Sequence, residues 1–167
     1  MTAGTPIPYR RVQVGGLFVV AGVLGVVLTG VFALTRSPET LAQAGWTLWA
    51  LAAVLLLAVL LNGWLTVGVT ADEVRVRLGV GFYGRTIPVS SIIRCDAVRT
   101  RVWWGWGAHW TPSGWLYNVS GRDAVRLEMR AERPVVIGTG DLTGLKQAID
   151  AAMAAATDRA GRASQRG

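Results

Sequence analysis

Two stretches of sequence decide the fold: VGGLFVVAGVLGVVLTGVFAL at residues 14–34 and WTLWALAAVLLLAVLLNGW at residues 46–64. Neither stretch contains a charged side chain. As α-helices rising about 1.5 Å per residue they would be about 31 Å and about 28 Å long, which matches a hydrocarbon core of about 30 Å. A chain inside lipid must satisfy its backbone hydrogen bonds internally, and a helix does so. The sequence therefore predicts two transmembrane helices.

The short segment between the two stretches, residues 35–44, predicts a membrane hairpin. This segment carries Arg36, whose charge Glu39 offsets. The basic residues that flank the hairpin are Arg10 and Arg11 before it and Arg75 and Arg77 after it. Because positive charge collects on the cytoplasmic side of a membrane helix, we expect both termini in the cytoplasm and the chain in the inner cell membrane.

The composition agrees with a membrane protein and excludes several classes of site. Of 167 residues, 51% are hydrophobic and 16% are charged, and the mean hydropathy is +0.39. These values argue against a disordered chain and against an ordinary soluble globule. One cysteine and one histidine exclude a disulfide framework, a multi-cysteine zinc site and a histidine-rich metal cluster. We expect no metal, no cofactor and no enzymatic activity.

Small residues repeat at four-residue spacing along the first stretch. They are Ala21, Gly25, Thr29 and Ala33. Small side chains let a second helix approach closely. That helix could be the second stretch of the same chain or a second copy of the protein, or the small residues could simply reflect their abundance here.

After residue 64 the pattern changes to the two-residue period of β-strands. Val74, Val76 and Leu78 alternate with arginines, and the apolar residues of 125–129 alternate with Arg126 and Glu128. Further short runs at 65–70, 82–88, 92–100, 115–120 and 135–138 are separated by glycine, proline, aspartate and asparagine. About seven strands follow, and we expect an antiparallel barrel.

The C-terminal region predicts one amphipathic helix and a tail. Asp141 is a candidate N-cap, and apolar residues from Leu142 to Met153 recur three and four positions apart. The predicted layout is a cytoplasmic segment at 1–11, a hairpin at 12–64, a cytoplasmic barrel domain with its closing helix at 65–156, and a disordered tail at 157–167.

These features together resemble the bacterial pleckstrin-homology-like (bPH) family of small membrane proteins. The residues that carry the resemblance are VTADEVRV at 69–76, IPVSSI at 87–92, GWG at 105–107 and VVIGT at 135–139, which leads into the helix. The resemblance implies a pleckstrin-homology-like barrel of about seven strands, capped by a C-terminal helix and lying after two membrane helices. Members of this family mostly lack a known activity. Phosphoinositide binding does not carry over, because the turn at Ala71-Asp72-Glu73 is acidic.

Two catalytic-looking motifs have simpler explanations. The pattern G-x-G-x-x-G at 79–84 would bind a dinucleotide only before a helix, whereas the β-branched and proline-containing run at 85–89 follows it. Cys95 is a candidate nucleophile because Asp96 is adjacent to it. Neighbouring residues of a strand, however, point to opposite faces of the sheet. We interpret the glycines as a hairpin turn and Cys95 as a buried, unreactive thiol.

The most unusual stretch is rich in tryptophan, and it contains the candidate working surface. The candidate residues are Arg99, Arg101, Trp103, Trp104, Trp106, His109 and Trp110. Three interpretations stay open: the tryptophans pack against the barrel, they insert into the membrane interface beside arginines, or they bind a peptide or protein partner.

The predicted function is a non-catalytic, membrane-anchored interaction or scaffolding module at the cytoplasmic face. The alternative is an auxiliary subunit that regulates a larger membrane enzyme or transporter. The expected partners are the lipid bilayer and a protein partner or second copy. Nucleic acid is not expected, because no long basic run or nucleic-acid module is present, and no small-molecule substrate is evident.

Overall fold

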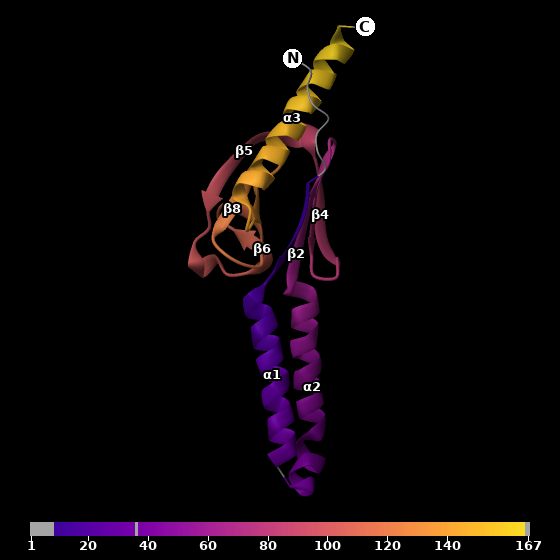
Figure 1. Cartoon of the computed structure of the whole chain (residues 1–167), viewed down its shortest axis with the longest axis vertical. Helices are drawn as coiled ribbons and strands as arrows, with labels where there is room; N and C mark the ends of the chain where they lie inside the picture. The colour runs from indigo at the N-terminus through magenta and orange to yellow at the C-terminus, as the bar shows by residue number, and fades with distance from the viewer. Residues whose placement is uncertain (1–8, 36, 166–167) are drawn as a thin grey trace.

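The computed structural model describes residues 9–35 and 37–165, and Figure 1 shows two long helices that extend from one end of a sheet domain. A third helix lies across the domain and extends beyond its other end. In chain order the elements are β1 (Tyr9–Val14), α1 (Gly16–Thr35), α2 (Pro38–Asn62), β2 (Trp64–Val69), β3 (Glu73–Leu78), β4 (Tyr83–Pro88), the 3₁₀ helix η1 (Val89–Ser91), β5 (Ile92–Arg99), the 3₁₀ helix η2 (Val102–Trp104), β6 (Gly107–Thr111), β7 (Gly114–Asn118), β8 (Asp123–Met129), β9 (Val135–Gly138) and α3 (Leu142–Ser164).

The helices α1 and α2 are long and apolar enough to cross a membrane. Their spans, Gly16–Thr35 and Gly45–Asn62, have mean hydropathies of 2.7 and 2.0, and 6% and 0% of their residues are buried within the protein. They pack along each other through glycines of α1. A Cβ atom on Gly22 would lie 2.3 Å from Val59 Cγ2, and one on Gly25 would lie 2.4 Å from Leu55 Cδ1. The second helix of the same chain therefore occupies part of the predicted small-residue face.

The strands β1 and β2 continue the two helices and pair with each other. The antiparallel ladder runs from Tyr9 opposite Val69 to Val14 opposite Trp64, and the Gly15 N–H donates to the Gly63 carbonyl at 2.7 Å. The predictions that a helix begins at Val14 and that another ends at Trp64 are therefore wrong by a few residues. Cross-strand pairing takes both residues into the sheet, and the segment predicted as a cytoplasmic extension supplies the first half of β1.

The turn between β3 and β4 lies against the end of α2. Gly79 has φ +54°, and a Cβ atom there would lie 2.2 Å from the Leu60 carbonyl oxygen. This close approach lets the Val80 N–H donate to the Leu60 carbonyl at 3.0 Å. The last turn of a helix leaves carbonyls without partners, and here the sheet domain supplies one. The predicted glycine turn at 79–84 is thus a contact between the domain and α2.

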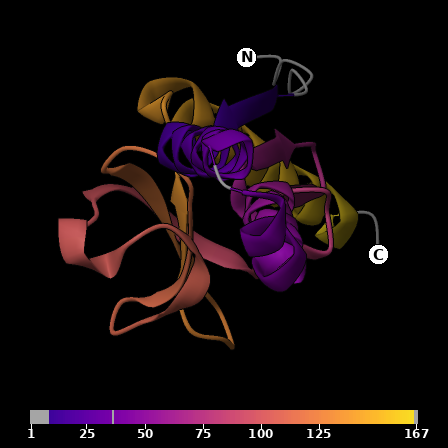
Figure 2. The same ribbon diagram turned by 90° about the horizontal axis from the view of Figure 1, so that it is seen from below.

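The strands form two sheets rather than one closed barrel. The order is β1-β2-β3-β4 in one sheet and β5-β8-β9-β7-β6 in the other, with no ladder between them in the described ranges. Nine strands are present there instead of about seven, because β1 and β6 were not predicted. The pair β7 and β9 is parallel, whereas the remaining pairs are antiparallel. Viewed from below, the five-stranded sheet lies to one side of the two helices (Figure 2).

The core lies between the inner faces of the sheets and under α3. Leu145, Ile149 and Ala152 of α3 are fully buried with residues of both sheets. Asp141 caps this helix as predicted, because its carboxylate accepts from the Gly144 N–H at 3.0 Å. The helix continues to Ser164, so most of the segment predicted as a disordered tail at 157–167 is helical. The alanine-rich sequence favours this continuation, and Arg159 donates to the Ala71 carbonyl at 2.8 Å.

Candidate functional site

The tryptophan-rich stretch forms the connection from β5 through η2 to the edge strand β6. Gly105 and Gly107 allow its tight path, since both have positive φ, +72° and +112°. A Cβ atom on Gly107 would lie 3.4 Å from Asn62 Oδ1, so β6 begins beside the end of α2. The stretch is therefore placed at the junction between the sheet domain and the two long helices.

Two of the candidate residues hold this connection in place. Trp104 packs against a small cluster of Leu116, Ala124 and Val136 on the far face of the five-stranded sheet. The ring of His109 bonds through Nε2 to the Trp104 carbonyl oxygen. These contacts support the first of the three interpretations for Trp104 and His109, because both side chains are engaged within the domain.

Three other candidate tryptophans are exposed, Trp103, Trp106 and Trp110, and the first two lie near Arg101. Trp103 is 76% exposed, with the Arg101 guanidinium 5.5 Å from its ring centroid. Trp106 is 38% exposed and, with Arg101 and Arg122, lines a shallow hollow of about 170 Å³. An aromatic ring beside a guanidinium combines an apolar body with a positive charge, which suits a lipid interface or a protein partner.

The remaining candidates lie apart from this pair. Arg99 is paired with Asp123 at 3.3 Å across the β5–β8 ladder, so a neighbouring carboxylate offsets its charge. Trp110 lies on β6 under Arg133, whose guanidinium carbon is 4.6 Å from the ring centroid. The seven predicted residues thus divide between structural contacts, an exposed aromatic pair and a separate Arg–Trp pair.

Sequence reasoning missed the exposed apolar turn between β3 and β4. Val80, Phe82 and Tyr83 are 50%, 84% and 57% exposed. In Figure 1 this turn and the connection after β5 both reach the level at which the two long helices leave the sheet domain. In Figure 2, which looks along these helices, the connection after β5 lies to one side of them. The signal was present in the sequence, because two glycines flank apolar residues in Gly79-Val-Gly81-Phe82. We call Val80, Phe82 and Trp103 the apolar rim.

The nucleophile candidate is inactive in this environment. Cys95 is buried, and that burial, with a smaller effect of Asp150, raises the pKa of its thiol from 9.0 to about 12. A thiol with so high a pKa holds almost no thiolate at neutral pH, and the thiolate is the reactive form. Within residues 9–35 and 37–165, no group of three or more His, Cys, Asp or Glu side chains could hold a metal ion.

The chain matches no protein-family model, no curated protein and no solved structure.

Proposed function

We propose that this chain is a two-pass integral membrane protein whose sheet domain lies against the cytoplasmic leaflet as a non-catalytic interaction or scaffolding module. In this proposal the domain is of the bacterial pleckstrin-homology-like type. Two facing sheets with a C-terminal helix packed over their inner faces support that assignment. The observation that carries the proposal is the direct continuation of a sheet into two apolar helices with outward-facing side chains.

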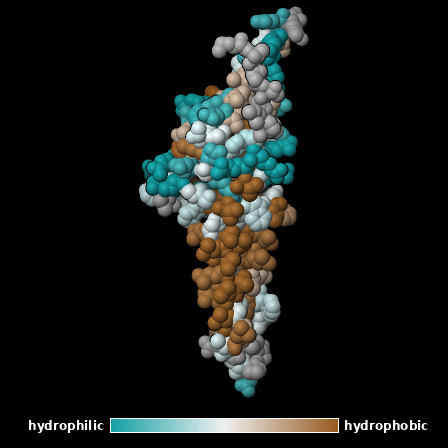
Figure 3. Space-filling model, viewed as in Figure 1, coloured by the Kyte–Doolittle hydropathy of each residue, from teal (hydrophilic) through white to brown (hydrophobic). Residues whose placement is uncertain are grey.

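The surface of α1 and α2 supports insertion into lipid. Leucine and valine side chains are exposed along both helices, and Figure 3 shows them as a continuous brown band below the mostly hydrophilic domain. Exposing so large an apolar area to water would be costly, at about 25 cal/mol per Å². A bilayer removes this cost for the whole band at once.

The pairing of β1 with β2 supports the proposed topology. Because these strands neighbour each other in one sheet, the chain must leave the membrane on the side from which it entered. Arg10, Arg11, Arg75 and Arg77 all lie on that side. The positive-inside rule then favours the cytoplasm for the sheet domain and for both ends of the chain.

The apolar rim supports close contact between the domain and the leaflet. Phe82 lies in the turn between two strands of the four-stranded sheet, and Trp103 lies in η2, which precedes a strand of the other sheet. Both side chains are exposed, and both connections reach the ends of the two long helices (Figure 1). Aromatic side chains favour the interface between headgroups and acyl chains. In this proposal the rim dips into the leaflet and fixes the tilt of the domain.

Site-specific labelling of the full chain in vesicles tests this arrangement. Because Cys95 is buried, Phe82→Cys and Ile93→Cys would each carry one reactive thiol. Ile93 is the matched control, since it is 55% exposed but lies at the start of β5, away from the helices. A fluorophore at position 82 should be quenched by lipid-borne nitroxide, and one at position 93 by a water-soluble quencher. Equal quenching of both labels by the water-soluble reagent would contradict rim insertion.

The same variants test topology and membrane insertion. A membrane-impermeant maleimide should label Ile93→Cys, which stays in water, in inverted vesicles but not in intact cells. Labelling in intact cells would overturn the cytoplasmic assignment, and full-length chain that stays dispersed without detergent would overturn insertion itself.

A groove between α1 and α2 supports the alternative function, in which the chain is an auxiliary subunit of a larger membrane enzyme or transporter. This groove of about 460 Å³ is lined by small residues, among them Thr29, Gly30 and Ala33, and by larger apolar side chains such as Leu48 and Trp49. Crosslinking in intact membranes followed by affinity purification separates the two functions. Recovery of one stoichiometric membrane enzyme or transporter would favour the auxiliary subunit over a free-standing module.

A further inference from the structure

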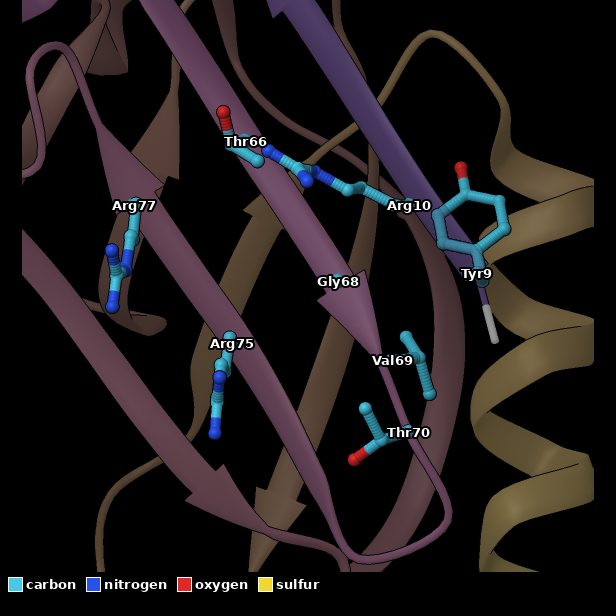
Figure 4. A pocket seen from close by; sticks show the side chains of 8 residues that line it. All are labelled: Tyr9, Arg10, Thr66, Gly68, Val69, Thr70, Arg75 and Arg77. Carbon is cyan, nitrogen blue, oxygen red and sulfur yellow. The ribbon is translucent and has the colours of Figure 1, made fainter. Parts of the chain in front are cut away.

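A basic groove lies on the outer face of the four-stranded sheet, on the side away from the core. Its volume is about 340 Å³, and its lining includes Arg10 of β1, Thr66 and Gly68 of β2, and Arg75 and Arg77 of β3. Figure 4 shows Arg10 reaching along β2 toward Thr66, with Arg75 and Arg77 on the neighbouring strand. The three arginines therefore line one hollow, with Arg10 extending over β2 and the Arg75 and Arg77 side chains extending from β3 away from β2.

The groove results from the register of the three strands. Gly68 is paired with Arg10 on one side and with Arg75 on the other, and Thr66 is paired with Arg77 in the adjacent row. Gly68 has no side chain, so the space on β2 between Arg10 and Arg75 is not filled. A Cβ atom there would find its nearest contact at 3.8 Å, which means that neither packing nor backbone strain requires the glycine. The absent side chain leaves space for a ligand.

The charges of the groove are only partly offset by the protein. Arg75 is paired with Glu73, whereas no ion pair of Arg10 or Arg77 is found in the described part of the chain. Guanidinium groups bind phosphate oxygens through paired, charge-assisted hydrogen bonds. The Thr66 hydroxyl can add a further donor. The chemistry of the groove therefore fits a phosphate group.

The groove is also close to the proposed membrane surface. At about 3.3 Å per residue, the row of Thr66 and Arg77 lies about 7 Å beyond Trp64, where β2 leaves the end of α2. The headgroup layer on each side of a bilayer is about 5 to 8 Å thick. Val14 and Trp64 lie on the same outer face between the helix ends and this row, and Val12 lies in the row itself, beside Thr66. Both valines are more than half exposed.

From this geometry we infer that the groove binds the phosphate of an anionic phospholipid in the cytoplasmic leaflet. Arg10, Arg77 and Thr66 hold the headgroup, and the acyl chains lie along Val12, Val14 and α1. A lipid is favoured over a soluble anion because the apolar valines and Trp64 connect the groove directly with the membrane helices. This inference rests on the proposed membrane insertion.

The test uses the full-length chain in detergent micelles and native mass spectrometry to measure bound lipid. The probes are phosphatidylglycerol, phosphatidylcholine with the same acyl chains, and inorganic phosphate. Phosphatidylglycerol should bind most tightly. Arg10→Gln and Arg77→Gln should each weaken its binding about fivefold, and the double variant about 25-fold. Micelles make this measurement independent of any effect of the arginines on orientation in the cell.

Two further variants separate the groove from general charge and from misfolding. Arg130→Gln removes the same charge from an exposed arginine that follows β8 and lies near η1, at the end of the domain opposite α1 and α2 (Figure 1). It should leave phosphatidylglycerol binding unchanged. Gly68→Val fills the floor with a residue that favours strands and keeps every charge. It should weaken phosphatidylglycerol binding at least fivefold while the far-ultraviolet circular dichroism spectrum stays that of the parent.

Three results would overturn the inference. They are equal binding of the two phospholipids, equal losses for Arg130→Gln and Arg77→Gln, and inorganic phosphate binding as tightly as phosphatidylglycerol. Each of these results would leave the proposed membrane insertion standing, because a chain that needs detergent can still lack a binding site for a lipid headgroup. A chain that stays dispersed without detergent would instead overturn the proposed function first.

Discussion

Asp141 joins three parts of the protein, and its replacement by alanine should show how firmly β1 is held. Its carboxylate accepts from the Gly144 N–H at 3.0 Å, from Arg11 Nη1 at 3.0 Å and from the Tyr9 hydroxyl at 3.4 Å. One side chain therefore caps α3 and fixes the strand that leads into α1. Asp141→Ala should loosen both.

The expected loss follows from these contacts. Removing an N-cap costs about 1 kcal/mol. The Arg11–Asp141 pair is partly exposed, with side-chain exposures of 47% and 30%, so it adds about 0.2 to 1 kcal/mol. Asp141→Ala should therefore lower the free energy of unfolding by about 1.5 kcal/mol. Asp141→Asn should cost less, because asparagine caps a helix as well as aspartate does and loses only the charge.

Denaturant unfolding of the full chain in micelles, followed by tryptophan fluorescence, measures these values. Asp150→Ala is the matched control, because Asp150 lies on the same helix and pairs only locally with Lys146. It should change stability by less than about 0.5 kcal/mol. Equal losses for Asp141→Ala and Asp141→Asn would refute the capping argument, and a loss for Asp141→Ala no larger than for Asp150→Ala would refute the whole assignment.

Three further predictions follow from packing and burial. Gly22→Val should separate α1 from α2, because a Cβ atom there would meet Val59. It should lower the free energy of unfolding in micelles by about 1 to 3 kcal/mol. Gly30→Val is the control and should be tolerated, because a Cβ atom there would meet no neighbouring group within 4 Å. Gly161→Ala should raise helicity by circular dichroism, whereas Gly144→Ala should not, since its Cβ would lie 2.4 Å from the capping carboxylate. Cys95 should resist maleimide until the chain unfolds, because its thiol is buried. Burial also raises the pKa of this thiol to about 12, so between about pH 9 and pH 12 the folded form keeps a proton that the unfolded form has lost. The free energy of unfolding therefore falls over this pH range, and Cys95→Ala should make that fall smaller.

The sequence was sufficient to predict where the three helices lie but not where all of them begin and end. The helix α2 begins at Pro38, inside the predicted connection at 35–44, and α3 continues into the predicted tail. The long uncharged runs predict α1 and α2 because length and hydropathy act within each helix. By contrast, β1 depends on a partner more than 50 residues away along the chain. Its alternation is also unclear, because Arg10, Val12 and Val14 share the outer face while Gln13 is buried with its amide bonded to the Gly138 carbonyl. A two-residue pattern with valines outside and glutamine inside does not indicate a strand.

The candidate site was also predictable only in part, because its arrangement depends on contacts between residues that are far apart in the chain. The abundance of tryptophan drew attention to residues 99–110, yet sequence alone does not distinguish Trp104, packed on the sheet, from Trp103, which faces solvent. The groove around Gly68 arises from cross-strand register. Arg10 is more than 60 residues from Arg75 in the chain, and only the ladders bring them to one hollow.

The pairing of β1 with β2 also changes what counts as the folding unit of the domain. Residues 65–156 were predicted to form a self-contained domain after the hairpin, but β1 precedes the hairpin and lies in the same sheet. The Gln13 side chain donates to the Gly138 carbonyl at 3.0 Å and so reaches the other sheet. Topologically, the two long apolar helices α1 and α2 are an insertion into the turn of a β-hairpin formed by β1 and β2.

Two soluble designs test this view. A chain that begins at residue 65 lacks β1 and exposes both an unpaired strand edge and buried side chains, so it should aggregate or fail to unfold cooperatively. A chain in which Asn-Gly replaces residues 16–62 keeps the hydrogen bond between Gly15 and Gly63, and Asn-Gly is the preferred two-residue turn of a hairpin. It should give dispersed amide resonances and a cooperative unfolding transition in aqueous buffer. If the shorter chain folds equally well, β1 is dispensable, and β2 alone attaches the domain to the two apolar helices.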